Sequence, residues 1–291
     1  MTMAVRVSTA QNTMRGSDKA QQPEPAPLQL TSKDGTSLAV TVTGDGPPIV
    51  IVPGSLSMAG DWQAVTRVLA PELTTYVLNR CGRGSSGDHP SHSLEREIED
   101  VTAVLEVAGP EAVLFGHSFG ALVSLALAAQ RSVRSLILYE PGLALDRPVG
   151  GPAVEGFSDL VANGDPAAAL RFGLEHFVGL SPTEVEMFAQ AASWSQLVAM
   201  APTWSRELVA MDGYAVDLDR LSAIEIPTLM MAGEVSPSWL IKVSQTVHDA
   251  LPRCSWATLA GQGHVANETA PDLLAREVAA FVASLRFLAR P

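Results

Sequence analysis

The sequence predicts an α/β protein with a mostly parallel, doubly wound sheet and an inserted helical cap. From residue 28 onward, short apolar runs typical of buried strands alternate with longer amphipathic runs typical of helices. Regular alternation of this kind is the order of a parallel sheet that helices cover on both faces. Between residues 142 and 221 the helical runs continue without strands, which predicts an insertion over the ends of the sheet.

The elements can be placed in order along the chain. Residues 28–30 and 38–42 predict a hairpin that turns at Asp34-Gly35. The predicted elements that follow are a strand at 49–52, a helix at 61–70, a strand at 75–78, a helix at 93–108, a strand at 112–115, a helix at 121–130 and a strand at 133–139. After the insertion come strands at 227–232 and 255–259 and helices at 238–250 and 270–288. We therefore expect a core of residues 28–141 and 222–291, a cap of residues 142–221 and a flexible tail at 1–27.

Composition restricts the class of protein and its partners. The 291 residues carry a formal net charge of −12, which disfavours nucleic acid and membrane surfaces because no basic cluster offsets phosphate repulsion. No segment approaches the roughly 18 consecutive apolar residues that span a bilayer, and residues 1–27 lack the apolar stretch of a signal peptide. Cys81 and Cys254 are far apart, which favours neither a disulfide framework nor a zinc site. We expect a soluble cytoplasmic protein, and nothing in the sequence sets its oligomeric state.

The segment Gly116-His117-Ser118-Phe119-Gly120 joins a predicted strand to a predicted helix. Its two glycines leave room for the backbone to reverse, which would hold Ser118 in a strained conformation with its hydroxyl exposed. The amides at the start of the helix would then face a developing oxyanion. The pattern predicts a nucleophile elbow with Ser118 as the nucleophile, and an incidental serine in a tight turn is the alternative.

The chain from residue 28 to 291 resembles the α/β-hydrolase fold family, because a Pro53-Gly54 turn, a glycine-rich loop, the elbow and a late histidine occur in that family's order. The resemblance implies a triad of serine, acid and histidine. It implies His264 as the general base and then the general acid, since this histidine follows a predicted strand and precedes the last helix. It also implies an oxyanion hole from the backbone amides of Ser55 and Phe119. His117 and the other histidines are expected to be packed or solvated.

The acid of the triad is open between two glutamates. Many relatives place an aspartate shortly after the strand that follows the cap, but this chain has Ser236 there, and a neutral hydroxyl cannot stabilise an imidazolium as a carboxylate does. Glu140 ends the strand after the elbow helix, where a carboxylate requires a partner. The chain is similar there to the zearalenone-hydrolase-like lactonases, which carry a glutamate before a proline. We predict Glu140 as the acid, with Glu234 as the alternative and a dyad or another acid as the remaining options.

The glycine-rich loop gives a second, weaker signal. Gly82, Gly84 and Gly87 have the spacing of a dinucleotide-binding fingerprint, but a polar loop follows them instead of a helix. The acid nearest the position expected to bind a ribose is Glu106, which falls inside a predicted helix. We therefore expect no dinucleotide, and the triad mechanism requires no metal or organic cofactor.

The predicted cap is rich in Phe, Trp and Met, which favours an apolar pocket over the sheet. Trp194 and Trp204 are the predicted substrate-binding residues, with flat surfaces for a ring-containing compound, and Trp204 is the favoured pocket wall. We predict a serine hydrolase that cleaves an ester or lactone in a medium-sized, apolar small molecule. Carbon–carbon hydrolysis, a lyase or cyclase reaction on the same fold, and a non-catalytic small-molecule-binding protein are the alternatives.

Overall fold

The computed structural model describes residues 27–89 and 91–288, so the predicted tail lies outside the described residues except for Pro27. Its centre is one eight-stranded sheet in the order β1-β2-β4-β3-β5-β6-β7-β8. The strands are β1 (Leu28–Thr31), β2 (Ser37–Thr43), β3 (Pro48–Val52), β4 (Thr74–Asn79), β5 (Val113–His117), β6 (Ser135–Tyr139), β7 (Thr228–Gly233) and β8 (Cys254–Leu259). Strand β2 is antiparallel to both neighbours and the other pairs are parallel, which confirms the predicted hairpin and sheet.

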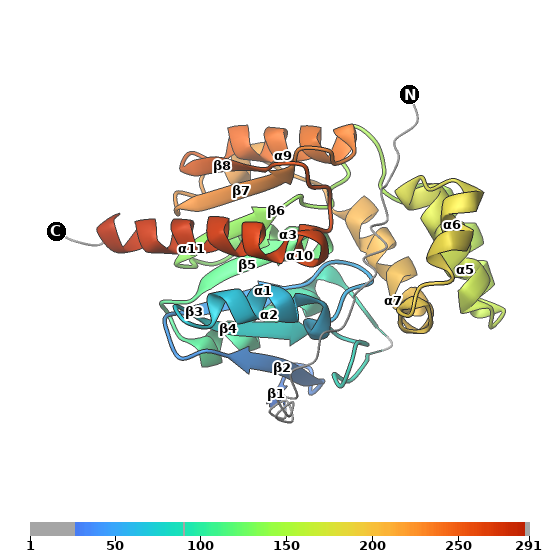
Figure 1. The fold of residues 1–291 in the computed structure, drawn as a ribbon, viewed down its shortest axis with the longest axis horizontal. Helices are drawn as coiled ribbons and strands as arrows, with labels where there is room; N and C mark the ends of the chain where they lie inside the picture. The colour runs from blue at the N-terminus through green and yellow to red at the C-terminus, as the bar shows by residue number, and fades with distance from the viewer. Residues whose placement is uncertain (1–26, 90, 289–291) are drawn as a thin grey trace, which may run out of the picture.

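Helices cover both faces of the sheet because alternate residues of each central strand face opposite layers (Figure 1). In β3, Ile49 and Ile51 pack in one apolar cluster, whereas Val50 and Val52 pack in the other. The first cluster contains α1 (Gln63–Leu69) and α11 (Pro271–Leu288), and the second contains α2 (Leu94–Ala108), α3 (Phe119–Ala128) and α9 (Ser238–Ala250). Two short helices, η1 (Ala59–Trp62) and α10 (Ala266–Thr269), contact α1 on the first face.

Ser118 and Glu140 directly follow β5 and β6, two strands in the buried centre of the sheet. Every residue in both strands is buried. Burial on two faces explains why these segments read as continuous apolar runs instead of alternating ones. Because all their neighbours are parallel strands, the residues that follow β5 and β6 emerge together at one edge of the sheet.

A helical insertion of residues 142–221 separates β6 from β7. Its helices are α4 (Ala153–Ala162), α5 (Pro166–Gly173), the π-helical turn η2 (Leu174–Val178), α6 (Pro182–Phe188), α7 (Trp194–Gly213) and α8 (Leu218–Leu221). Helices α5, α6 and α7 lie beyond the edge of the sheet toward which β7 points (Figure 1). The insertion has an aromatic interior, in which the rings of Phe157, Phe177 and Trp204 meet at steep angles with centroids 5.4 to 5.6 Å apart.

Candidate active site

Ser118 lies at a sharp turn between β5 and α3. Its φ of 53° and ψ of −117° lie in a region that residues with a side chain rarely adopt. The flanking glycines permit close packing here: a Cβ on Gly120 would lie 2.0 Å from Val52 O, and one on Gly116 would lie 2.4 Å from Gly120 O. The structure therefore has the strand-to-helix turn that the motif predicts, and β3, β5 and α3 are too close for any other residue at these two positions.

The loop after β3 passes beside Ser118. A Cβ on Gly54 would lie 2.9 Å from Ser118 Cβ, so glycine is required for this approach. Within the described part of the chain, neither Ser55 N–H nor Phe119 N–H has a hydrogen-bond acceptor. The Phe119 amide is free because the first N–H groups of a helix have no intrahelical partner. Two unpaired donors thus flank the nucleophile position.

His264 and Glu140 form a direct contact. His264 lies in the loop between β8 and α10, and its Nδ1 is 2.5 Å from Glu140 Oε2. Glu140 follows β6, is fully buried and has a φ of 45°. Its other oxygen, Oε1, accepts a hydrogen bond from Gly233 N–H at 2.7 Å. Both carboxylate oxygens are therefore occupied, and a proton on His264 Nδ1 leaves Nε2 as the basic nitrogen.

Among the described residues no hydrogen bond joins Ser118 Oγ to His264 Nε2. Bonds between nucleophile and base are often long in a free enzyme and shorten when substrate binds. The two residues share His117 as a neighbour, since its ring centroid lies 4.7 Å from that of His264 and its backbone adjoins Ser118.

Two buried side chains hold the backbone around His264. His117 Nε2–H donates to His264 O at 2.8 Å, and the Tyr139 hydroxyl donates to Gly263 O while accepting from Ala266 N–H at 3.2 Å. Burial, followed by the proximity of His264, holds the pKa of His117 well below its usual value, so this imidazole is neutral. The sequence predicted a packing role for His117, but it gave no sign of Tyr139, whose partner Gly263 is 124 positions away.

The alternative acid has a different environment. Glu234 is exposed, and its Oε2 accepts from Gly261 N–H at 2.7 Å. Ser236 is 2% exposed, and its Oγ has no hydrogen-bond partner in the described residues. The structure thus brings Glu140 to His264 and leaves Glu234 at the surface.

The two tryptophans of the insertion lie in different settings. Trp204 is 5% exposed within the aromatic interior. Trp194 is half-buried, and the guanidinium of Arg171 covers its ring at 4.9 Å from the centroid. A role in substrate binding stays a prediction for both.

A buried charged cluster, not foreseen from the sequence, lies behind the loop at Gly54. It contains Arg80 and Arg83 from the glycine-rich loop, Glu97 from α2 and Glu207 from α7. Arg80 also lies 4.7 Å from the ring centroid of Phe119. The sequence shows two arginines in a glycine-rich loop, but it carries no signal that pairs them with Glu207, 124 positions after Arg83.

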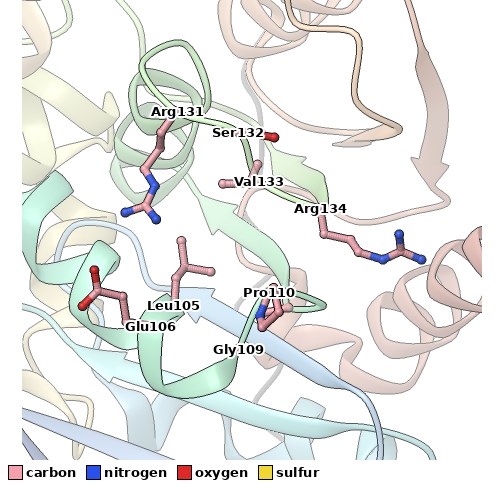
Figure 2. A pocket seen from close by; sticks show the side chains of 9 residues that line it. Leu105, Glu106, Gly109, Pro110, Arg131, Ser132, Val133 and Arg134 are labelled. Atoms are coloured by element: carbon pink, nitrogen blue, oxygen red, sulfur yellow. The ribbon is translucent and has the colours of Figure 1, made fainter.

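One cavity can be excluded as the site of this chemistry. A cavity of about 280 Å³ lies between the end of α2 and the residues that lead into β6, lined by Gly109, Ala112, Arg131 and Arg134 among others (Figure 2). Ala112 precedes β5 whereas Ser118 follows it, which separates the two residues by roughly 20 Å of extended chain.

Two further kinds of site are absent from the described residues. No group of three or more His, Cys, Asp or Glu side chains there could hold a metal ion. No helix among them is long and apolar enough to cross a membrane.

Comparison with known proteins identifies the family of this fold. A family model described as the alpha/beta hydrolase family matches residues 49–277. The chain is 35% identical to an alpha/beta hydrolase from Sphaerobacter thermophilus, with a TM-score of 0.79 and coverage of 87% of this chain and 99% of that one. It is 28% identical over 252 residues to a pimeloyl-acyl-carrier-protein methyl ester esterase from Vibrio campbellii, covering 82% of this chain and 96% of the relative. It is 30% identical over 176 residues to an N-formylmaleamate deformylase from Pseudomonas putida, covering 58% of this chain and 56% of the relative. The chain belongs to the alpha/beta hydrolase family.

Proposed function

We propose that the protein is a serine hydrolase that cleaves an ester or lactone bond in a medium-sized, apolar small molecule. The observation that carries the proposal is the contact between His264 Nδ1 and the buried carboxylate of Glu140. It lies at the edge of the sheet where Ser118 is held in a sharp turn between two unpaired amides. Nucleophile, base, acid and oxyanion donors are the complete set that acyl transfer through a serine requires.

The first half of the reaction forms an acyl-enzyme. Ser118 Oγ attacks the substrate carbonyl carbon while His264 Nε2 takes the hydroxyl proton. The negative charge that develops on the carbonyl oxygen accepts hydrogen bonds from Ser55 N–H and Phe119 N–H. When the tetrahedral intermediate collapses, the carbon–oxygen bond of the ester breaks, and the leaving alcohol takes the proton from His264. In a lactone the alcohol stays attached to the acyl chain.

The second half releases the acid. Water attacks the acyl carbon and gives a proton to His264, and Ser118 regains that proton as the carboxylic acid leaves. Glu140 stabilises the imidazolium in both halves, because its Oε2 faces the Nδ1–H that carries the charge. Each oxyanion donor is worth about 3 kcal/mol in the transition state.

Apolar side chains near the nucleophile turn support an apolar substrate. Met211 of α7 reaches Gly142, where a Cβ would lie 2.9 Å from the Met211 sulfur and 3.6 Å from Phe119 N. Val265, next to His264, is 45% exposed and therefore accessible to an apolar group of a substrate. We include in the proposal that residues 142–221 act as a cap whose inner surface accepts the apolar part of the substrate. The likeness to zearalenone-hydrolase-like lactonases favours testing large lactones as well as esters.

Labelling with a fluorophosphonate tests the nucleophile. We expect a covalent adduct on Ser118 in the folded protein, and its complete loss in Ser118→Ala. Ser195→Ala is the matched control, because Ser195 is an exposed serine of α7. Absence of any adduct on Ser118 in folded wild type would refute the hydrolase and favour a binding protein on the same fold.

A panel of substrates then tests which type of bond the enzyme cleaves. Esters of increasing acyl length, small and large lactones, a β-diketone and, in view of the deformylase relative, an N-formyl amide separate the reaction classes. We expect turnover of esters or lactones that increases with apolar surface. Turnover of the β-diketone alone would replace the ester proposal by carbon–carbon hydrolysis.

A cytoplasmic location belongs to the same proposal. Its support is that Cys81 and Cys254 are both free thiols, as is usual in a reducing compartment. Fractionation of cells that express the native gene tests it, and recovery in a secreted or membrane fraction would contradict it.

A further inference from the structure

Two buried arginines converge on the carbonyl of Gly54, the residue before the proposed oxyanion donor. Arg80 Nη2–H donates to Gly54 O at 2.9 Å, and Arg83 Nη1–H donates to the same oxygen at 3.2 Å. Both residues follow β4 and are 1% exposed. Because both donors are charged and enclosed, the carbonyl is held firmly in one direction.

The direction of this carbonyl sets the direction of the next amide. Gly54 O and Ser55 N–H belong to one planar peptide unit, and in a trans peptide they point in opposite directions. The described residues contain no cis peptide bond. The two guanidinium groups therefore turn Ser55 N–H away from themselves. They also draw electron density from the amide, which makes its N–H a stronger donor.

The counter-charge for the arginines comes partly from the insertion. Glu207 of α7 is 1% exposed, and its Oε1 accepts from Arg80 Nη2 at 2.8 Å and also from Arg83 Nη2. Thr203, one turn earlier in α7, accepts from Arg83 Nη2 at 2.9 Å. From the core, Glu97 accepts from Arg80 Nη1 at 2.8 Å. The same Glu97 oxygen also lies 2.9 Å from Nε2 of His92, whose side chain is buried. The two guanidinium cations are thus matched by two carboxylates in a place where an unpaired charge would be strongly unfavourable.

We infer that Arg80 and Arg83 are positioning residues that aim and polarise Ser55 N–H for the oxyanion, and that Glu207 makes this arrangement depend on the insertion. The inference rests on the proposed function, because it names the groups that prepare the same oxyanion hole. It gives the insertion a part in the chemical step beyond covering a pocket. Burial lowers the pKa of Arg83 to about 10 against the opposing effect of Glu207, so both guanidinium groups are charged at neutral pH.

Arg83→Lys and Glu207→Gln test the inference by steady-state kinetics on p-nitrophenyl butyrate. Lysine keeps a positive charge beside Glu207 but has no second nitrogen for Gly54 O. We expect kcat to fall about 10- to 100-fold for Arg83→Lys, with KM within about threefold, since a misaimed donor weakens the transition state more than the ground state. Glu207→Gln keeps the side-chain shape and removes the charge, so its kcat should fall by a smaller factor.

Arg206→Gln is the matched control. Arg206 also extends from α7 to the glycine-rich loop, where it contacts Cys81 O and Asp88 but not Gly54. We expect wild-type kcat for this variant. Wild-type kcat in folded Arg83→Lys and Glu207→Gln would overturn the inference, and so would an equal fall in all three variants.

The affinity for phenylboronic acid distinguishes two explanations of a lower kcat: a misdirected Ser55 N–H and a smaller fraction of folded protein. Phenylboronic acid forms a tetrahedral adduct with a nucleophilic serine. In the two variants its Kd should therefore rise by about the factor by which kcat/KM falls. An unchanged Kd together with a smaller fraction of fluorophosphonate-labelled Ser118 would show a merely structural role and overturn the inference.

A crystal structure of the wild-type boronate adduct gives a result that needs no variant. We expect a boronate oxygen to accept from Ser55 N–H while Gly54 O keeps both guanidinium partners. An oxygen placed elsewhere overturns the inference but leaves the proposed function intact, because the adduct itself requires a reactive Ser118. Failure of the wild type to react at Ser118 with either probe overturns the proposed function instead.

Discussion

The ends of β6 and β7 each carry a glutamate directly after the strand, yet the two carboxylates have opposite environments. Glu140 is fully buried and contacts His264, whereas Glu234 is exposed and bonds to the backbone of Gly261. Strand register explains the difference. Tyr139 is paired with Met231, so Glu140 lies at the level of residue 232, still inside the sheet, while Glu234 lies two residues further out. Both glutamates directly follow a strand, so their position in the sequence does not distinguish them. The register between β6 and β7 determines which carboxylate is buried.

A second polar residue, Ser236, lies after β7 and has no role in the proposed site. Ser236 Oγ is buried without a partner in the described residues, close to Gly233, whose N–H is bound by Glu140. Glu140 therefore reaches across from β6 to the place where an acid after β7 would lie. The comparison predicts that Glu140, after β6, matters to catalysis and that Glu234, after β7, does not. It also predicts that a carboxylate introduced after β7 can partly replace Glu140.

The largest expected effect is that of Glu140→Gln. The amide has one oxygen, which cannot accept from both His264 Nδ1–H and Gly233 N–H, and it carries no charge to stabilise the imidazolium. By analogy with removal of a triad carboxylate, kcat should fall by about 10³- to 10⁴-fold. Initial rates on the best ester measure it, with thermal unfolding as the control for folding. Turnover near that of the wild type would show that Glu140 is not the acid.

The next largest effect is a partial recovery by Ser236→Asp in the Glu140→Gln background. A carboxylate at position 236 would restore a negative charge near the loop of His264, so we expect kcat to recover about tenfold, since a misplaced acid returns a part of the lost stabilisation. The same assay measures it. Ser236→Asp alone should lower activity, because two buried carboxylates then repel each other. A double variant no faster than Glu140→Gln would place Ser236 outside reach of the imidazole.

A small effect is expected for Glu234→Gln. The amide oxygen can still accept from Gly261 N–H, so the loop before His264 keeps its support, and kcat should stay within about threefold of wild type while stability changes by less than about 1 kcal/mol. Side-by-side kinetics with Glu140→Gln give the direct contrast between the two strand ends. A loss as large as that of Glu140→Gln would reverse the assignment of the acid.

The smallest effect is expected for Ser236→Ala. This change removes a buried hydroxyl that lacks a partner, so the free energy of unfolding should be unchanged or rise by up to about 1 kcal/mol. Urea unfolding measures it, with Ser195→Ala as an exposed reference. A clear loss of stability would mean that the hydroxyl has a bond that matters to the fold.

The sequence was sufficient for features whose determinants are close together in the chain. The elbow is such a case, because Gly116, Ser118 and Gly120 fix the turn within five residues, and the alternation of strands and helices is another. For the acid, the sequence favoured Glu140 but left Glu234 as an alternative, since both glutamates follow strands and the register between β6 and β7 is a property of the folded sheet.

The buried charged cluster was beyond sequence reasoning for a different reason. Arg83 and Glu207 are 124 positions apart, and a buried ion pair leaves no periodic pattern in either segment. The richness of the insertion in Phe, Trp and Met likewise favoured an apolar pocket with Trp204 as a wall, but composition cannot distinguish the interior of the insertion, where Trp204 lies, from the wall of a pocket.

The positive φ angles at the site have a consequence for engineering. Among the described residues, the non-glycine positions with positive φ are Leu56, Ser118 and Glu140, which are the neighbour of one oxyanion donor, the proposed nucleophile and the proposed acid. Each holds strain of order 1 kcal/mol or more, which glycine would relieve. A library of variants selected for heat resistance alone is therefore expected to favour glycine at such positions, and glycine at Ser118 or Glu140 would abolish the proposed reaction.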